Sequence, residues 1–109
     1  MAMAKKRSGP DPVDPVHWKS VRYEAVPWGK ARGLKQNGGY VATFDEATGA
    51  ELWLVKVYDV TYERGMEHDK QDVFITSLAV DRNRGQLAVE NEAGERFVID
   101  LETRAVSPP

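Results

Sequence analysis

From residue 16 onward the chain is a series of short apolar-rich runs separated by Gly, Asp and Asn turn residues. Within these runs apolar and polar residues roughly alternate, and no window of eleven residues shows helical spacing of apolar positions. Such a pattern is typical of β-strands joined by tight turns. We therefore expect an all-β fold of six to seven mostly antiparallel strands in hairpins, arranged as a sandwich or an open barrel. The clearest runs are YVATFD (40–45), ELWLVKVYDVTY (51–62), VFITSLAVD (73–81), QLAVEN (86–91) and RFVIDL (96–101).

At 109 residues the chain has the length of one domain. Residues 1–15 contain three prolines and a Lys-Lys-Arg cluster with few apolar side chains, so we expect a disordered tail there. Residues 16–107 form the predicted single β domain.

The period-2 alternation also predicts which side chains form the core. Residues 51–62 and 73–81 are apolar on both sides, and the first of these runs is expected to be a central strand of its sheet. The predicted core consists of Tyr40, Phe44, Trp53, Val55, Val57, Phe74, Leu78, Leu87, Val89, Phe97, Ile99 and Leu101.

The segment FDEATG (44–49) predicts a hairpin turn from local chemistry. The Asp45 carboxylate can accept hydrogen bonds from the amides two and three residues later, and Gly49 can adopt the left-handed conformation. The Asp-x-x-Thr spacing recurs 55 residues later at Asp100 and Thr103. There, Arg104 occupies the position of the glycine, so we expect that turn to close differently.

The stretch YVATFDEATGAELW resembles the blade repeat of quinoprotein-type (PQQ-like) β-propellers at Asp45, Thr48, Gly49 and Trp53. The resemblance covers residues 40–53 and implies that these four residues are structural. It implies no cofactor, and a chain of this length is too short for a whole propeller. As a whole, the chain also resembles small proteobacterial proteins to which no activity is attached.

Composition limits the possible functions. The chain has no cysteine, which excludes disulfides and thiolate chemistry, and its longest apolar run is far shorter than a membrane-spanning helix. Because no secretory signal precedes the domain, the expected location is cytoplasmic. No serine lies in a Gly-x-Ser-x-Gly setting and no glycine loop has phosphate-binding spacing, so the sequence predicts a protein that is not an enzyme and needs no cofactor.

Basic and aromatic residues alternate in HWKSVRYEAVPWGKARGLKQ (17–36). This stretch lies within residues 1–40, which are basic, while residues 41–109 are acidic. Aromatic side chains could stack on bases while the cations contact phosphates, which suggests nucleic-acid binding. Alternatively, Trp18 and Tyr23 face the core of a small β domain. The candidate contacts to nucleic acid or another partner are Trp18, Lys19, Arg22, Trp28, Lys30, Arg32 and Lys35.

A second candidate site is EHDKQD, where one imidazole and three carboxylates fall within six residues. This set could hold a divalent cation and support a metal-dependent activity at 67–72, or it could be a solvated loop. Its members are Glu67, His68, Asp69 and Asp72.

Two strands that are apolar on both sides leave, in so short a chain, apolar surface that the chain itself cannot fully cover. A partner would cover this surface. Unpaired strand edges also invite another chain. The leading functional prediction is therefore a non-enzymatic interaction module that binds another protein or itself.

Overall fold

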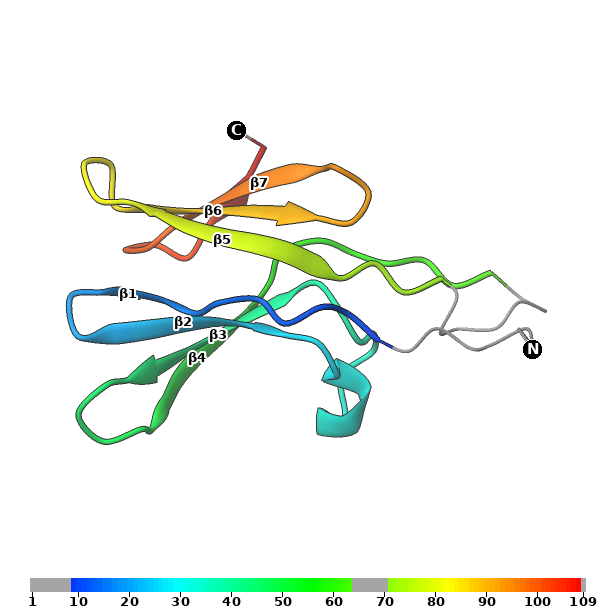
Figure 1. Cartoon of the computed structure of the whole chain (residues 1–109), viewed down its shortest axis with the longest axis horizontal. Helices are drawn as coiled ribbons and strands as arrows, with labels where there is room; N and C mark the ends of the chain where they lie inside the picture. Colours follow the sequence, from blue (N-terminus) through cyan, green and yellow to red (C-terminus); the bar gives the residue numbers. More distant parts are fainter. Residues whose placement is uncertain (1–8, 64–70, 109) are drawn as a thin grey trace.

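A computed structural model of the chain describes residues 9–63 and 71–108, and the description that follows concerns these residues. Eight strands form two antiparallel sheets, each with its strands in chain order (Figure 1). The first sheet, called sheet A, contains β1 (Val16–Trp18), β2 (Val21–Val26), β3 (Tyr40–Asp45) and β4 (Glu51–Lys56). The second, called sheet B, contains β5 (Ile75–Asp81), β6 (Gln86–Asn91), β7 (Arg96–Asp100) and β8 (Val106–Ser107). A single 3-10 turn, η1 (Gly29–Arg32), lies between β2 and β3.

The two sheets share one core between their facing sides, which makes the fold an antiparallel sandwich and confirms the all-β prediction. Period-2 alternation puts every second residue of each strand into this layer. The buried cluster is made of Tyr23, Val41, Val57, Ile75, Leu78, Leu87, Val89, Ile99 and Leu101.

Eight strands replace the expected six to seven because VHWKSVRYEAV forms two strands. Lys19 and Ser20 make a two-residue turn between β1 and β2, in which both residues have positive φ (50° and 63°). Such turns normally carry Asn or Gly. Neither residue occurs here, so the sequence gives no signal of the turn.

The position of β4 corrects a second expectation. The run that starts at residue 51 was expected to be central, yet β4 is the last strand of sheet A and pairs with β3 alone. Apolar residues on both of its sides predicted two neighbouring strands, and the described chain supplies one.

Strand β3 shows why the core prediction is only partly correct. Val41 and Thr43 point into the shared core, whereas Tyr40, Ala42 and Phe44 lie on the outer side of sheet A. Period-2 alternation separates the two faces of a strand without saying which face is inside. Four residues were missed by the prediction and are buried: Tyr23, Val41, Ala42 and Ile75. Four predicted residues are only partly buried: Phe44, Trp53, Val55 and Phe97.

The segment 27–39 covers part of the outer side of sheet A. Gly29 lies so close to Tyr40 that a Cβ atom there would stand 2.7 Å from the tyrosine ring. The Arg32 guanidinium binds both carboxylate oxygens of Glu51 at 2.7 and 2.8 Å, which ties the segment to the start of β4. This cover explains why Tyr40 and Ala42 are buried although they point away from the core.

The two Asp-x-x-Thr turns occupy the same place in both sheets, between the third and fourth strand, and they have the same hydrogen bonds. Asp45 accepts from the amides of Ala47 and Thr48 at 2.8 and 3.1 Å. Asp100 accepts from the amides two and three residues later at 2.8 and 2.9 Å. Arg104 adopts the left-handed conformation (φ 67°) that Gly49 adopts in the first turn (φ 77°). The expectation that the second turn closes differently is therefore wrong.

Part of the segment expected to be a tail contributes to the fold. Residues 9–15 run between β2 and β5 (Figure 1), and Val13 packs against the core cluster. The described structure therefore extends upstream of the expected domain start at residue 16.

The strained turn between β1 and β2 gives a stability prediction. Ser20→Gly should raise the free energy of unfolding by about 1 kcal/mol, because glycine tolerates positive φ. Urea denaturation measures this. Ala79→Gly, in the middle of β5, is the comparison variant and should lower stability by about 0.5–1 kcal/mol. A Ser20→Gly variant no more stable than the unmodified protein would contradict the assigned turn.

A pH prediction comes from the second Asp turn. The backbone amides of Thr103 and Glu102 donate to Asp100 and hold the pKa of its carboxyl below the ordinary value. The resulting stabilisation is complete above the unfolded-state pKa of about 3.9 and is lost as the pH falls through the lower folded-state pKa. Unfolding free energies measured from pH 6 to pH 2 should therefore fall less steeply in Asp100→Asn than in the unmodified protein. Identical slopes would refute this role.

Candidate functional site

The structure separates the seven predicted contact residues. Trp18 and Lys19 lie at the turn between β1 and β2, whereas Trp28 follows the opposite end of β2. Five residue steps along β2 correspond to roughly 17 Å. The seven side chains therefore do not form one continuous surface.

At the first end, Trp18 serves the fold. It packs against the core, and its ring lies 3.5 Å from the position that a Cβ atom of Gly85 would occupy. The ammonium of Lys19 lies 4.5 Å from the centre of the Trp18 ring. This placement agrees with the alternative interpretation of Trp18 as a core residue.

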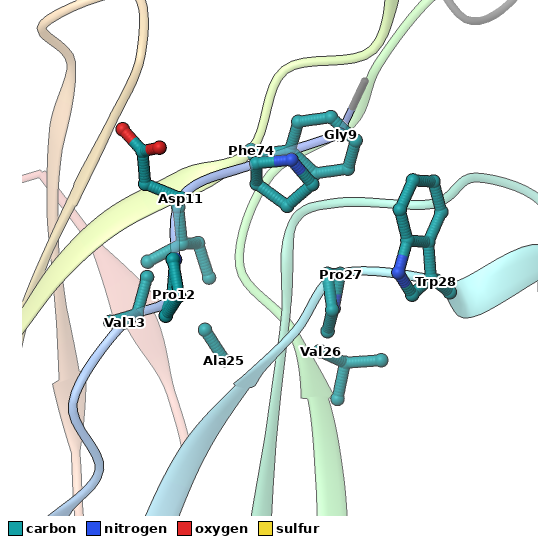
Figure 2. A pocket seen from close by; sticks show the side chains of 11 residues that line it. Gly9, Asp11, Pro12, Val13, Ala25, Val26, Pro27, Trp28 and Phe74 are labelled. Atoms are coloured by element: carbon teal, nitrogen blue, oxygen red, sulfur yellow. The ribbon is translucent and has the colours of Figure 1, made fainter. Parts of the chain in front are cut away.

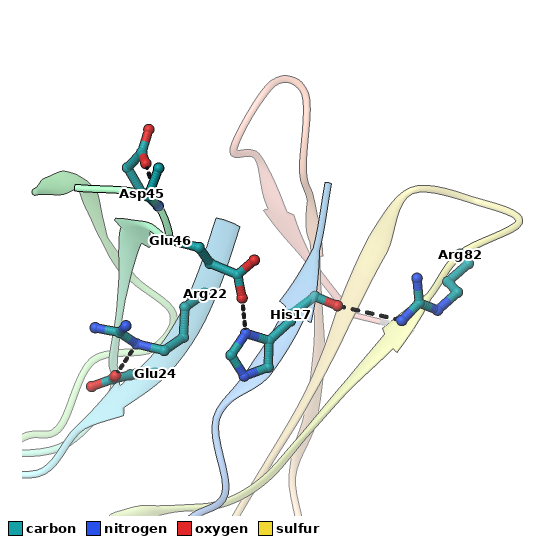
Figure 3. A network of polar contacts seen from close by, with 7 residues as sticks. His17, Arg22, Glu24, Asp45, Glu46 and Arg82 are labelled. Atoms are coloured by element: carbon teal, nitrogen blue, oxygen red, sulfur yellow. Dashed lines mark hydrogen bonds and ion pairs between the residues drawn. The ribbon is translucent and has the colours of Figure 1, made fainter. Parts of the chain in front are cut away.

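Carboxylates near this end pair with several basic groups (Figure 3). Arg22 pairs with Glu24 and lies over the ring of Phe44 on the outer side of sheet A. His17 on β1 contacts Glu46 in the turn after β3. Arg82 donates to the carbonyl oxygen of His17 at 3.5 Å, which links β1 to the turn between β5 and β6.

At the other end, Lys30 lies 4.2 Å above the ring of Tyr62. Arg32 reaches back to Glu51, which pairs with Phe44 in the register and so lies at the end of sheet A that carries Arg22. Lys35 is exposed. Nucleic-acid binding by the segment 17–36 stays a prediction, and the cations that would contact phosphate are distributed over both ends of sheet A.

The candidate metal ligands Glu67, His68 and Asp69 lie outside the described residues. Asp72 is described and is buried. Its two oxygens accept from the Tyr62 hydroxyl at 2.5 Å and from the Asn37 side-chain amide at 3.1 Å. Within 9–63 and 71–108, no group of three His, Asp or Glu side chains is placed to hold a metal ion.

A buried polar network surrounds Asp72. Gln36 donates to the carbonyl oxygens of Gly38 and Tyr58, both at 2.8 Å, and accepts from the amide of Val60 at 2.8 Å. Burial, together with the hydrogen bond to Asp72, raises the pKa of Tyr62 to about 12. The network attaches the connection between the two sheets to the segment that follows η1.

Beside this network lies a pocket of about 290 Å³ (Figure 2). Three separate parts of the chain form it: residues 9–13, the end of β2 with Pro27 and Trp28, and the pair Phe74–Ile75. Trp28 is 48% exposed, and its ring meets that of Phe74 edge-on with centroids 5.6 Å apart. Most of the side chains that line it are apolar or aromatic, although polar atoms contribute slightly more of the exposed lining than apolar atoms do. Such a lining can receive an apolar group while polar atoms orient it.

Acidic side chains stand at the rim of this pocket. Asp11 is exposed, and its carboxylate points away from Trp28 (Figure 2). An adjoining hollow of about 110 Å³ shares Asp11 and Phe74 with the pocket and is also lined by Glu92. The rim therefore favours a ligand that carries positive charge next to an apolar group.

Sequence reasoning named Trp28 but missed the pocket. Its other walls come from residues far apart in the chain, and Pro10 and Pro12 were placed in the tail. A tryptophan directly after a strand-ending proline, in a loop rich in glycine, was the signal available.

No protein-family model, no curated protein and no solved structure matches this chain. The described residues form a two-sheet antiparallel sandwich of eight strands, and this architecture alone does not assign the chain to a family. In the described part of the chain, no helix has the length and apolar character needed to cross a membrane. The propeller-blade resemblance stays a prediction.

The network around Asp72 gives a stability prediction. Tyr62→Phe should lower the free energy of unfolding by about 1–2 kcal/mol, because it removes a hydrogen bond to a buried carboxylate. Urea denaturation followed by circular dichroism measures the loss. If the variant proves as stable as the unmodified protein, Tyr62 does not support the network in the way described.

Proposed function

We propose that the chain is a non-enzymatic protein-interaction module that takes up an apolar side chain of a partner protein in the pocket beside Trp28. The observation that carries the proposal is the half-exposed Trp28 ring at the edge of a preformed pocket with mainly apolar side chains. Exposed aromatic residues next to a pocket are the side chains that most often dominate the energy of protein–protein interfaces.

The lining of the pocket supports binding rather than catalysis. Of the described residues that line it, Asp11 alone is ionisable. Nucleophilic catalysis ordinarily pairs a nucleophile with a base within hydrogen-bonding distance, and the described residues of the lining contain no such pair.

The rim indicates the chemistry of the partner. Asp11 adds negative charge at the pocket, and Glu92, whose carboxylate accepts from the amide of Phe74, lines the adjoining hollow. A partner segment with an apolar or proline side chain next to Lys or Arg matches both the lining and this rim.

A displayed library of random peptides, panned against the immobilised protein, tests this function. We expect enrichment of peptides that combine an apolar or proline residue with Lys or Arg. Trp28→Ala should weaken the binding of these peptides at least tenfold, measured by fluorescence anisotropy, because the substitution removes one wall of the pocket.

The matched control is Leu52→Ala. Leu52 has the same exposed fraction as Trp28, 48%, and does not line the pocket. Its variant should bind the selected peptides as the unmodified protein does. Failure to enrich any peptide, or equal binding by Trp28→Ala, would refute the proposed function.

A further inference from the structure

The free edge of β4 is the second surface that needs an explanation. β4 is six residues long, contains no proline, and carries its two charges at its ends, Glu51 and Lys56. Between them lies the uncharged run LWLV. In Figure 1, β4 forms the margin of sheet A, and no described strand pairs with its outer side. A long apolar edge of this kind promotes pairing with another chain.

The other three sheet edges are protected in ways that β4 is not. β1 has three residues and lies next to β5. β5 has an irregular register after Ile75, and residues 12–14 lie alongside it. β8 has two residues and is followed by Pro108. Short strands, bulges and prolines are the usual means of preventing edge pairing.

The hydrogen bonds between β3 and β4 show which backbone groups of β4 are available. The Val57 amide donates to Gly39 at 2.6 Å, and the Trp53 amide donates to Thr43 Oγ1 at 3.1 Å. Hydrogen-bonded and non-hydrogen-bonded pairs alternate along an antiparallel ladder. The amides of residues 53, 55 and 57 therefore face β3, and those of Leu54 and Lys56 face the free edge.

Side chains next to this edge also lack a complete cover. Leu52 is 48% exposed at the bulge opposite Thr43, and Leu54 is partly exposed on the outer side of sheet A. The apolar pattern of β4 on both sides is that of a central strand. A second neighbouring strand would place side chains of the same face beside Leu52 and Leu54.

We propose that β4 pairs in antiparallel orientation with β4 of a second copy of this chain, across a two-fold axis at or next to Leu54. The two copies of sheet A then form one continuous eight-stranded sheet. Antiparallel pairing brings Glu51 of one copy, which its own Arg32 binds, towards Lys56 of the other, which its own Asp59 binds, so the charges alternate in sign at both ends. Parallel addition would bring like charges together. This surface contains no residue of the Trp28 pocket, and the inference does not depend on the proposed function.

Sedimentation equilibrium of the full chain tests the pairing. We expect a concentration-dependent dimer of twice the monomer mass of 12.2 kDa. Leu54→Lys should weaken dimerisation at least tenfold, because it places a charge at the axis. Ala79→Lys, an exposed residue on the outer side of sheet B, adds the same charge elsewhere and should leave dimerisation unchanged. A strictly monomeric protein at millimolar concentration, or equal dimerisation by Leu54→Lys, would overturn the proposal.

Hydrogen exchange tests the backbone contact directly. The amides of Leu54 and Lys56 should become more protected as the protein concentration rises across the dimerisation range. Unchanged exchange at both amides while the dimer forms would show that the copies associate through another surface, which overturns the proposal.

Because the chain contains no cysteine, single cysteines can report on the axis without interference. Leu54→Cys should give a disulfide-linked dimer under mild oxidation, and Ala79→Cys should not. Equal cross-linking of the two variants would contradict an axis at or next to Leu54.

Discussion

The structure depends on burying one apolar layer between two four-stranded sheets. An antiparallel sheet can leave one face to water, but its other face must be covered. Neither sheet has a cover of its own for this inner face, so each requires the other. Trp53 shows the dependence clearly: its ring meets Tyr23 of its own sheet edge-on, and Arg104 of the opposite sheet lies 5.0 Å from its centre. Tyr58 likewise stacks on Phe97 of sheet B, with centroids 5.3 Å apart.

Joining the two sheets requires a long connection after β4, and that connection brings polar backbone near the core. Buried polar groups need hydrogen-bond partners. Gln36 and Asn37, which follow η1, supply them to Val60 and Asp72, and no buried side-chain polar atom of the described residues lacks a partner. Since Phe74 comes directly after this connection, the same network also fixes one wall of the pocket beside Trp28. The structural role of this network and the proposed binding role of the pocket are therefore linked.

Turns whose hydrogen bonds lie within a few residues could be predicted from the sequence. Backbone conformations that depend on contacts with distant residues could not. The turn at Asp45 was predicted because its hydrogen bonds lie within a few residues. The left-handed conformation of Arg104 was not, since a non-glycine residue adopts it at a cost that surrounding structure must offset. Its guanidinium lies over Trp53, a residue of the opposite sheet, and no sequence pattern indicates that contact.

The same distinction applies to the burial of strand faces and to the residues that form the candidate site. Alternation in β3 separates Val41 from Tyr40, but the burial of Tyr40 depends on the segment around Gly29, whose position over sheet A is a tertiary property. The pocket could not be predicted because its walls come from three distant segments, and Trp28 alone gave a local signal. The predicted contact residues are continuous in sequence, but the extended strand β2 places those at its start and those after its end far apart.

The proposed pairing through β4 and the proposed pocket beside Trp28 could act together in binding a partner. An edge pairing through β4 uses backbone groups and is symmetric, whereas the pocket beside Trp28 is lined by side chains and contains no β4 residue. A pair of chains joined at β4 would therefore carry two separate pockets. For a partner with two apolar segments, occupation of the first pocket raises the effective concentration at the second, provided that its linker spans the distance between them. Weak individual contacts, as expected for a pocket of about 290 Å³, would then combine into stable binding. The unprotected edge and the small pocket have a common explanation in this arrangement, because the edge supplies the multiplicity that the pocket needs.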